Sequence, residues 1–365
     1  MTRKVNLIFV LAMLGLALSG QQKLPVIKSN VKKIDIRDGN TFKKAAWTIV
    51  PEAKPDLYTT TGKKVTFYTG LDSISFNIRR NKVYNFIILL NGKDSAYTQI
   101  KYQAEKKEPS YLAVLKKGNK YNQYDSRALL RFMYDPEQTQ YLREIRDKFK
   151  LDSISGGGDE VSRILNLLHW VHDSFTFNGQ NELPVYDGLA DLMTKCYKSK
   201  NTMYCGALAG VLNVCYLSMG LKSRQVVCLP KDSTDFDCHS INTVYSKTLN
   251  KWLWMDPTNN AYVMNERGDL LSIAEVRDRL INNKPLILNP DANINRVNSR
   301  TKKDYLYEYM AKNLYAFQCF TDGGGESKSN LLLPVEYKGI IPRTRMNKPK
   351  CTTNPELFWA KPEEE

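Results

Sequence analysis

The stretch from Tyr204 to Gly220 constrains the fold of this chain most, because it predicts a buried helix. Small and apolar residues recur there at helical spacing, at positions 205, 208, 209, 212, 215, 216 and 219. Gly220 stands where a left-handed residue would end such a helix. The helix therefore begins at Cys205. Its thiol is expected among the unpaired N–H groups of a helix N-terminus, which favour thiolate over thiol.

Two strands are predicted downstream of this helix. One covers residues 237–245 and carries His239, and the next covers residues 251–258 and carries Asp256. A histidine on one strand and an aspartate on the next can supply the base for a cysteine nucleophile and the group that orients that base. The sequence thus suggests three catalytic groups that are distant in the chain.

The predicted hairpin allows the histidine and the aspartate to meet. If its loop centres on Thr248 and Leu249, Asp256 faces Ile241, which shares a strand face with His239. The two side chains are then diagonal neighbours within reach of each other. A loop shifted by half a residue would place them on opposite faces, so the register decides whether the pair can form.

In this order the residues resemble the transglutaminase-like superfamily of papain-type cysteine enzymes. The resemblance covers roughly residues 150 to 290 and lies in the cysteine helix, the histidine strand and the Trp-Leu-Trp-Met-Asp-Pro-Thr strand. It implies that Cys205 is the nucleophile, His239 the general base and acid, and Asp256 the group that orients the histidine. Residues 203–206 read Met-Tyr-Cys-Gly where eukaryotic transglutaminases have Gly-Gln-Cys-Trp. The resemblance therefore leaves open whether the reaction is hydrolysis or transfer.

Further residues are candidates for supporting roles at the site. Asn260 has the strand parity of Asp256 and could orient the histidine instead, because papain-like enzymes use asparagine. An oxyanion hole needs donors where the tetrahedral oxygen forms, and the backbone N–H of Cys205 is a natural one. Three residues could supply the second donor, and the sequence does not rank them: Gln180, Trp170 and Tyr204.

The spacing of histidines and cysteines predicts no metal site. His169 and His172 lie three residues apart on a predicted helix, lack an obvious third ligand and are interpreted as packing residues. The seven cysteines include no Cys-x-x-Cys pair with zinc-finger spacing, so neither a metal nor a cofactor is expected. Their odd number leaves at least one thiol unpaired within the monomer, although Cys228 and Cys238 could pair across adjacent strands.

The first twenty residues have the pattern of a secretory signal peptide. Arg3 and Lys4 precede an apolar run from Val5 to Leu18, and small residues follow that run. The run is short for a membrane span, and no cysteine near the cleavage site could accept a lipid. A secreted or periplasmic protein without a stable membrane span is therefore expected.

The rest of the chain is interpreted as two domains and a tail. Residues 21–105 contain short alternating segments that predict a β-sandwich domain. Residues 106–345 are expected to form the transglutaminase-like domain, an α+β fold in which the cysteine helix packs on an antiparallel sheet. Residues 346–365 are expected to be a poorly ordered tail.

Short sequence patterns within the second domain predict helix caps and one further helix. Asp159 is a plausible helix N-cap, and Ser272 with Glu275 has the pattern of a capping box. Residues 305–320 are expected to be a tyrosine-rich helix that runs into a strand in the outer layer of the domain.

Charge and resemblance together lead to a functional hypothesis. The formal net charge of +15 favours anionic neighbours such as envelope polymers, while the spread of the lysines provides no nucleic-acid motif. The hypothesis is an exported cysteine-dependent enzyme that attacks a peptide or glutamine carboxamide through a thioester on Cys205. Its partner is then a protein or peptide substrate, and hydrolysis is preferred because water is always present. The alternative is a non-catalytic envelope or glycan-binding protein that uses the same fold as a scaffold.

Overall fold

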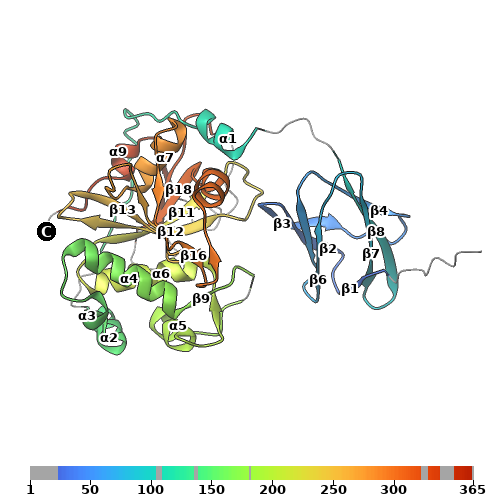
Figure 1. Ribbon diagram of the computed structural model, residues 1–365, viewed down its shortest axis with the longest axis horizontal. Helices are drawn as coiled ribbons and strands as arrows, with labels where there is room; N and C mark the ends of the chain where they lie inside the picture. Colours follow the sequence, from blue (N-terminus) through green and yellow to red (C-terminus); the bar gives the residue numbers. More distant parts are fainter. Residues whose placement is uncertain are drawn as a thin grey trace, which may run out of the picture. The chain divides into compact units, whose positions relative to one another are not determined.

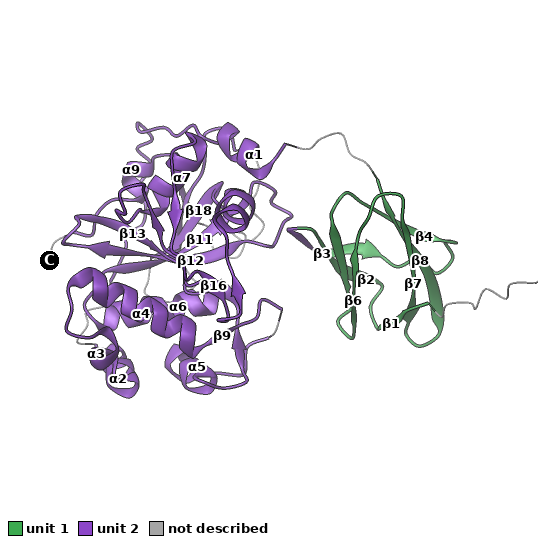
Figure 2. Ribbon diagram, viewed as in Figure 1, with its two compact units in different colours: residues 1–39, 44–104 green, residues 40–43, 105–365 purple. Residues whose placement is uncertain are grey.

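The computed structural model describes residues 24–103, 109–134, 139–180, 182–321, 328–337 and 349–363. The chain divides into two compact units (Figure 2). Unit 1 comprises Met1–Gly39 and Lys44–Ala104, and unit 2 comprises Asn40–Lys43 and Glu105–Glu365. The predicted signal peptide lies outside the described residues. Within the described ranges, no helix is both long enough and apolar enough to cross a bilayer.

Unit 1 is a β-sandwich (Figure 1). One sheet has the strand order β1 (Val26–Ser29), β7 (Val83–Leu90), β8 (Asp94–Tyr102), β4 (Asp56–Thr60), and the other has the order β3 (Thr41–Thr48), β2 (Lys33–Asp38), β5 (Lys64–Tyr68), β6 (Ser73–Asn77). Alternate residues of both sheets point into one shared core. Phe67 of β5 packs on Phe86 of β7 with ring centroids 5.1 Å apart. The prediction of an N-terminal β-sandwich is confirmed.

Unit 2 is built on a six-stranded sheet. Its strand order is β13 (Lys251–Met255), β12 (His239–Ser246), β11 (Ser223–Leu229), β18 (Ala316–Phe320), β19 (Ser329–Leu332), β20 (Lys350–Thr352). Neighbouring strands are antiparallel except for β19 and β20, which are parallel. Short paired strands lie outside this sheet: β9 (Thr176–Phe177), β10 (Thr202–Met203), β14 (Val263–Met264), β15 (Ile287–Leu288), β16 (Asn293–Ile294) and β17 (Asn298–Ser299).

Helices cover both faces of this sheet (Figure 1). One face carries α2 (Gln140–Phe149), α3 (Leu151–Ser155), α4 (Glu160–Ser174), α5 (Gly188–Cys196) and α6 (Cys205–Ser218). The other carries α1 (Tyr111–Lys117), α7 (Ile273–Ile281), the π-helix η1 (Lys303–Met310), α8 (Ala311–Asn313) and α9 (Pro355–Phe358). Each face therefore has its own apolar core, and the predicted α+β class is confirmed.

The predicted buried helix is α6. It packs on strands β11 and β12 and is also in contact with α2, α4 and α5. A helix covered on several sides is apolar around most of its circumference, as this sequence is. The chain leaves the helix through Gly220, whose φ of +73° is a left-handed conformation that glycine adopts without a steric cost. The predicted start and end of the helix are both confirmed.

The β12–β13 hairpin has the register that the sequence predicted. Asn242 pairs with Met255 and Val244 pairs with Leu253, as expected for a loop centred on residues 248 and 249. The Glu160 carboxylate at the start of α4 holds this turn, accepting hydrogen bonds from the Ser246 hydroxyl and from two backbone N–H groups of the loop. Asp256 follows Met255 directly.

The predicted helix caps are present. The Asp159 carboxylate accepts a hydrogen bond of 2.7 Å from the N–H of Ser162 at the start of α4. Ser272 and Glu275 form the reciprocal pair of a capping box at the start of α7. These local signals were readable because each depends on residues at most three positions apart.

The prediction of a disordered tail is wrong for the described residues 349–363. Strand β20 extends the central sheet, and Phe358 of α9 is fully buried. The guanidinium of buried Arg224 donates to the carbonyl oxygens of Phe358 and Ala360, at 3.0 and 2.9 Å. This segment orders because it provides both a strand and a core residue.

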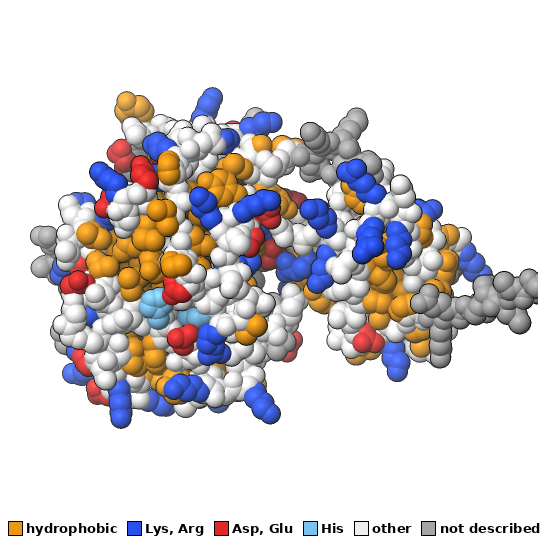
Figure 3. Space-filling view, viewed as in Figure 1, with side chains coloured by type: hydrophobic (Ala, Val, Ile, Leu, Met, Phe, Trp, Pro, Cys, Tyr) orange, Lys and Arg blue, Asp and Glu red, His pale blue; other side chains and the backbone are white. Residues whose placement is uncertain are grey.

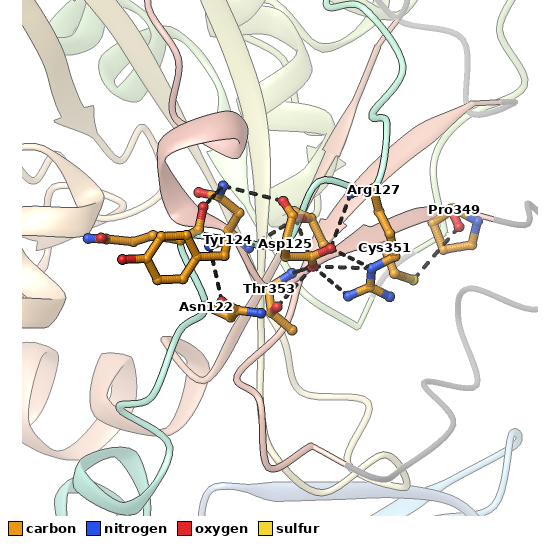
Figure 4. A network of polar contacts seen from close by, with 10 residues as sticks. Asn122, Tyr124, Asp125, Arg127, Pro349, Cys351 and Thr353 are labelled. Atoms are coloured by element: carbon orange, nitrogen blue, oxygen red, sulfur yellow. Dashed lines mark hydrogen bonds and ion pairs between the residues drawn. The ribbon is translucent and has the colours of Figure 1, made fainter.

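A polar network ties the same segment to residues 122–127 (Figure 4). The Asp125 carboxylate accepts hydrogen bonds from the Arg127 guanidinium and from both the N–H and the hydroxyl of Thr353. These bonds, that to Arg127 above all, hold the pKa of Asp125 well below its usual range. The N–H of Asn122 donates to the Thr353 carbonyl at 2.8 Å. A charged carboxylate thus anchors the last strand of the sheet.

Candidate active site

Cys205 is the first residue of α6, and its side chain is half-buried. Tyr204 precedes it as the N-cap residue and is 39 % exposed. The ring of Tyr204 folds back over the first helical turn. A Cβ added at Gly206 would come 2.6 Å from Cε2 of that ring. Glycine at position 206 is therefore what allows the tyrosine to lie beside the cysteine.

His239 is the first residue of β12 and is 2 % exposed. Its Nε2 donates to Oδ2 of Asp256 at 2.7 Å. The Cys205 side chain is hydrogen-bonded to the same imidazole, which leaves Nδ1 as the nitrogen available to the sulfur. The ring of Tyr309 packs against the imidazole with centroids 5.4 Å apart and planes inclined by 60°. The cysteine, histidine and aspartate therefore lie in one connected row.

Asp256 is completely buried, and both of its carboxylate oxygens are hydrogen-bonded. Oδ1 accepts from the backbone N–H groups of Thr258 and Asn259, at 2.9 and 3.2 Å. Oδ2 accepts from His239, from the Tyr305 hydroxyl at 2.6 Å and from the Asn259 amide at 2.8 Å. Burial opposes ionisation of this carboxyl, but the charge and hydrogen bond of His239 outweigh it and lower the Asp256 pKa.

The electrostatics of the site favour a charged cysteine–histidine pair. Burial acts to raise the pKa of Cys205, yet the hydrogen bond and positive charge of His239, with the N–H of Ser240, bring it below its ordinary value. Burial acts to lower the pKa of His239, but the charge of Asp256 raises it to about 10. Thiolate and imidazolium therefore stabilise each other.

The other cysteines lie in different surroundings. Burial raises the pKa of the thiol at five of them: Cys196, Cys215, Cys228, Cys319 and Cys351. No disulfide joins any two of the seven cysteines, all of which lie in the described residues, so the pair Cys228 and Cys238 that the sequence allowed does not form. Cys238 packs beside a separate small apolar cluster. Cys205 differs from these five cysteines, because the hydrogen bond and charge of His239 lower its pKa.

Asn260, the alternative orienting residue, belongs to another network. Its Oδ1 lies 2.7 Å from Nδ1 of His169, and its Nδ2 donates to Asp291 at 3.1 Å. Its φ of +46° turns the chain away from the strand. Alternation along the strand predicted that Asn260 and Asp256 share a face. The strand ends at Met255, so alternation does not continue as far as Asn260. Asp256 is thus the residue in contact with the histidine.

The three candidates for a second oxyanion donor are in different places. Trp170 of α4 packs in an aromatic cluster with Phe149, Phe175 and Tyr197. Gln180 is exposed, and its backbone N–H is bonded to the side chain of Asn178. Tyr204 adjoins the cysteine in the chain, so it is the candidate whose position is fixed next to the sulfur.

The two histidines of α4 do more than pack. His172 is buried and donates from Nδ1 to the carbonyl oxygen of Pro257 at 3.1 Å, and His169 binds Asn260. Both therefore hold the loop that follows Asp256. His169 is the more exposed, at 34 % of its side chain, and Figure 3 shows histidine atoms at the surface of unit 2 beside acidic ones. Across the described ranges, no group of three or more metal-ligating side chains converges.

Sequence reasoning missed the donors to Asp256. Residues 305–320 were expected in an outer layer, whereas Tyr305 and Tyr309 of η1 reach the aspartate and the histidine. Asn259 could have been suspected, because it lies three residues from Asp256. The Arg300 guanidinium donates to the Asn259 Oδ1 at 2.8 Å and so orients its amide toward the carboxylate. No short-range pattern pointed to Arg300 or Tyr305.

The fold and this row of side chains define a cysteine-centred site on a mixed α+β domain. Residues 148–257 match the family model of the transglutaminase-like superfamily, a range that includes Cys205, His239 and Asp256. This part of the chain is therefore a transglutaminase-like domain. No curated protein matches the chain.

Proposed function

We propose that this protein is a cysteine-dependent acyl-transfer enzyme whose Cys205 attacks a peptide or glutamine carboxamide. The observation that carries the proposal is the thiol at the α6 N-terminus, hydrogen-bonded to a buried histidine that Asp256 in turn holds. The superfamily match supports a cysteine-dependent acyl-transfer fold. The lowered pKa of Cys205 supports a nucleophile that ionises more readily than an ordinary thiol, because the charge and hydrogen bond of His239 favour the thiolate.

The proposed reaction has two halves. The Cys205 thiolate adds to the carbonyl carbon, and the negative charge moves to the carbonyl oxygen, where the backbone N–H of Cys205 is the natural donor. The His239 imidazolium then protonates the leaving nitrogen as the C–N bond breaks, which releases an amine or ammonia and leaves a thioester. Neutral His239 takes a proton from the second nucleophile, which attacks the thioester and returns Cys205 as thiolate.

The second nucleophile decides the class of enzyme. Water gives an amidase or peptidase, and a lysine amine gives a cross-linking transamidase. We favour water, because water can reach a half-buried thiol. Among the residues that the structure describes, we recognise no binding site for an amine substrate.

The first test is selective alkylation. Iodoacetamide near neutral pH, with the labelled peptides mapped by mass spectrometry, should modify Cys205 ahead of the other half-buried thiols, Cys238 and Cys351. His239→Ala should abolish that preference while the protein stays folded. Equal labelling of the three thiols would contradict the proposal and favour the alternative, a binding protein that uses the fold as a scaffold.

A second test separates hydrolysis from transfer. The protein is incubated with a glutamine peptide and a tagged primary amine. Release of ammonia without incorporation of the tag supports hydrolysis, and incorporation of the tag supports transamidation. A Cys205→Ser variant controls for chemistry that does not pass through the thiol.

We also propose that the protein is exported and acts among anionic envelope polymers. Residues 1–20 support export by their signal-peptide pattern, and the net charge of +15 supports the anionic surroundings. Lys and Arg side chains are spread over the visible face of both units (Figure 3). Cell fractionation with N-terminal sequencing of the recovered protein tests this. An intact N-terminus in the cytoplasmic fraction would contradict it.

A further inference from the structure

The Asp256 carboxylate is shared unevenly between its donors. Three of its five hydrogen bonds converge on Oδ2, the oxygen that holds His239. The shortest of the three, at 2.6 Å, comes from the hydroxyl of Tyr305. Tyrosine and histidine therefore compete for the electron density of one oxygen, in a place where both residues are buried from water.

Tyr305 reaches this oxygen from the opposite face of the sheet to α6. It lies on η1, with its ring fully buried and edge-on to Trp254 of β13, at a centroid distance of 6.3 Å and an angle of 84°. One π-helical turn further on, Tyr309 packs on the His239 ring. Short π-helical segments occur often at functional sites. Here the segment presents two tyrosines to the aspartate and the histidine together.

The hydroxyl of Tyr305 acts as a donor and not as an acid or base. Burial, and next the negative charge of Asp256, raise its pKa well above the ordinary value for tyrosine. The phenol therefore keeps its proton throughout the range in which the cysteine and histidine work. A neutral donor on a carboxylate oxygen weakens that oxygen as an acceptor for its other partner.

We propose that Tyr305 is a positioning residue that fixes the orientation of Asp256 and moderates how strongly Asp256 holds the His239 proton. The inference rests on the proposed function, because it concerns the proton that His239 would deliver. Without the phenol, Oδ2 would concentrate its charge on the histidine. His239 would then be a weaker acid toward a leaving group.

The test measures the pKa of His239 by nuclear magnetic resonance. The chain has three histidines, so the imidazole signals can be assigned with a His239→Gln variant. Tyr305→Phe keeps the ring and removes only the hydroxyl, and the His239 pKa should rise by about half a unit to one unit. The matched control is Tyr216→Phe. Tyr216 is also fully buried, but its hydroxyl donates to the carbonyl of Ile164, so the His239 pKa should stay unchanged.

A second replacement covers the case in which Tyr305→Phe does not fold. Site-specific incorporation of 3-fluorotyrosine at position 305 strengthens the phenol as a donor, so the His239 pKa should shift downward. An unchanged or opposite shift with either replacement, or an equal shift in Tyr216→Phe, would overturn the inference.

The outcome can be separated from that of the proposed function. If wild-type Cys205 shows no preferential alkylation, the enzyme proposal fails regardless of Tyr305. If wild-type Cys205 is preferentially alkylated and the His239 pKa does not respond to the two replacements, only the positioning role of Tyr305 is lost.

Discussion

At the scale of single residues, the site depends on charge held away from water. Asp256 is fully buried, and His239 is nearly so. A buried carboxylate is stable only when hydrogen bonds and an opposite charge replace its lost hydration, and Asp256 has five bonds of that kind. The negative charge of Asp256 stabilises the positive charge on His239, and that positive charge in turn stabilises a thiolate at Cys205.

The first prediction concerns pH. The pKa of Cys205 lies below its ordinary 9.0 and that of His239 is raised from 6.5 to about 10, so the ion pair persists between them. The alkylation rate of Cys205 should therefore begin to level off at a lower pH than that of a thiol with an ordinary pKa. In His239→Ala the histidine no longer lowers the pKa of Cys205. The alkylation rate should then continue to rise with pH through and beyond the ordinary thiol pKa. Iodoacetamide rate constants measured from about pH 5 to about pH 10 check this. Parallel profiles in the two proteins would contradict it.

The second prediction is for Asp256→Asn. The amide keeps the size of the side chain and removes the charge that raises the His239 pKa. Imidazolium is then no longer favoured, and alkylation of Cys205 near pH 6 should fall by about a hundredfold, which corresponds to about 3 kcal/mol. Asp291→Asn is the control, because that carboxylate is 53 % exposed and contacts His169 and Asn260 instead. A comparable loss in both variants would contradict the role given to Asp256.

Residues at the site differ in how far the sequence could reveal them. Cys205, His239 and Asp256 were readable because each sits at a helix start or on a hairpin whose geometry follows from local spacing. Tyr305 was not, because its bond to Asp256 spans 49 residues and crosses from a helix on one face to the end of a strand. Contacts of that kind depend on how helices pack on the sheet, and the periodicity of apolar residues in the sequence does not predict that packing.

At the scale of elements, β12 is held firmly just before His239. Lys312 of α8 is 3 % exposed, and its Nζ lies 2.9 Å from Asp235 and 3.0 Å from Asp237. The same amine donates to the Asp237 carbonyl at 2.8 Å. Charge pairing thus fixes the loop that leads into the strand, and with it the point where the histidine emerges.

The third prediction follows from this pairing. Lys312→Met leaves Asp235 and Asp237 without their buried cation, and the free energy of unfolding should fall by about 3 to 5 kcal/mol. Urea denaturation followed by circular dichroism measures it. Lys303→Met is the control, since Lys303 is 84 % exposed and its ion pair with Glu308 is 3.9 Å long. That variant should stay within about 0.5 kcal/mol of the wild type. Equal effects of the two changes would contradict the prediction.

Elements were predicted well where patterns were local and poorly where they were not. Helix α6 and the β12–β13 hairpin came from apolar spacing and loop length. Strand β20 was missed because it is three residues long and joins the sheet by parallel pairing with β19. A short, polar strand of this kind has no periodicity of its own and is ordered by the neighbour that it pairs with.

At the scale of the whole molecule, the two units have separate apolar cores. The sandwich core of unit 1 includes Phe67, and an apolar core of unit 2 includes Phe317; both rings are completely buried. All seven cysteines lie in unit 2. Thiol accessibility is therefore a direct probe of unit 2 alone.

The fourth prediction uses this separation. Phe67→Ala should destabilise unit 1 by about 3 to 5 kcal/mol and leave the denaturant dependence of Cys215 labelling unchanged. Phe317→Ala should do the reverse, exposing Cys215 at lower denaturant. Hydrogen exchange read by mass spectrometry follows each unit in the same samples. Loss of protection in both units from either change would contradict independent cores.

The position of β20 has a consequence for handling the protein. Strand β20 pairs with β19 and so satisfies backbone N–H and C=O groups of β19. Without β20, β19 would be an exposed edge strand to which another chain could add as an extra strand. A variant truncated before residue 349 would expose that edge strand and the part of the apolar core that Phe358 fills. Such a version should self-associate in solution even if its cysteine, histidine and aspartate are untouched.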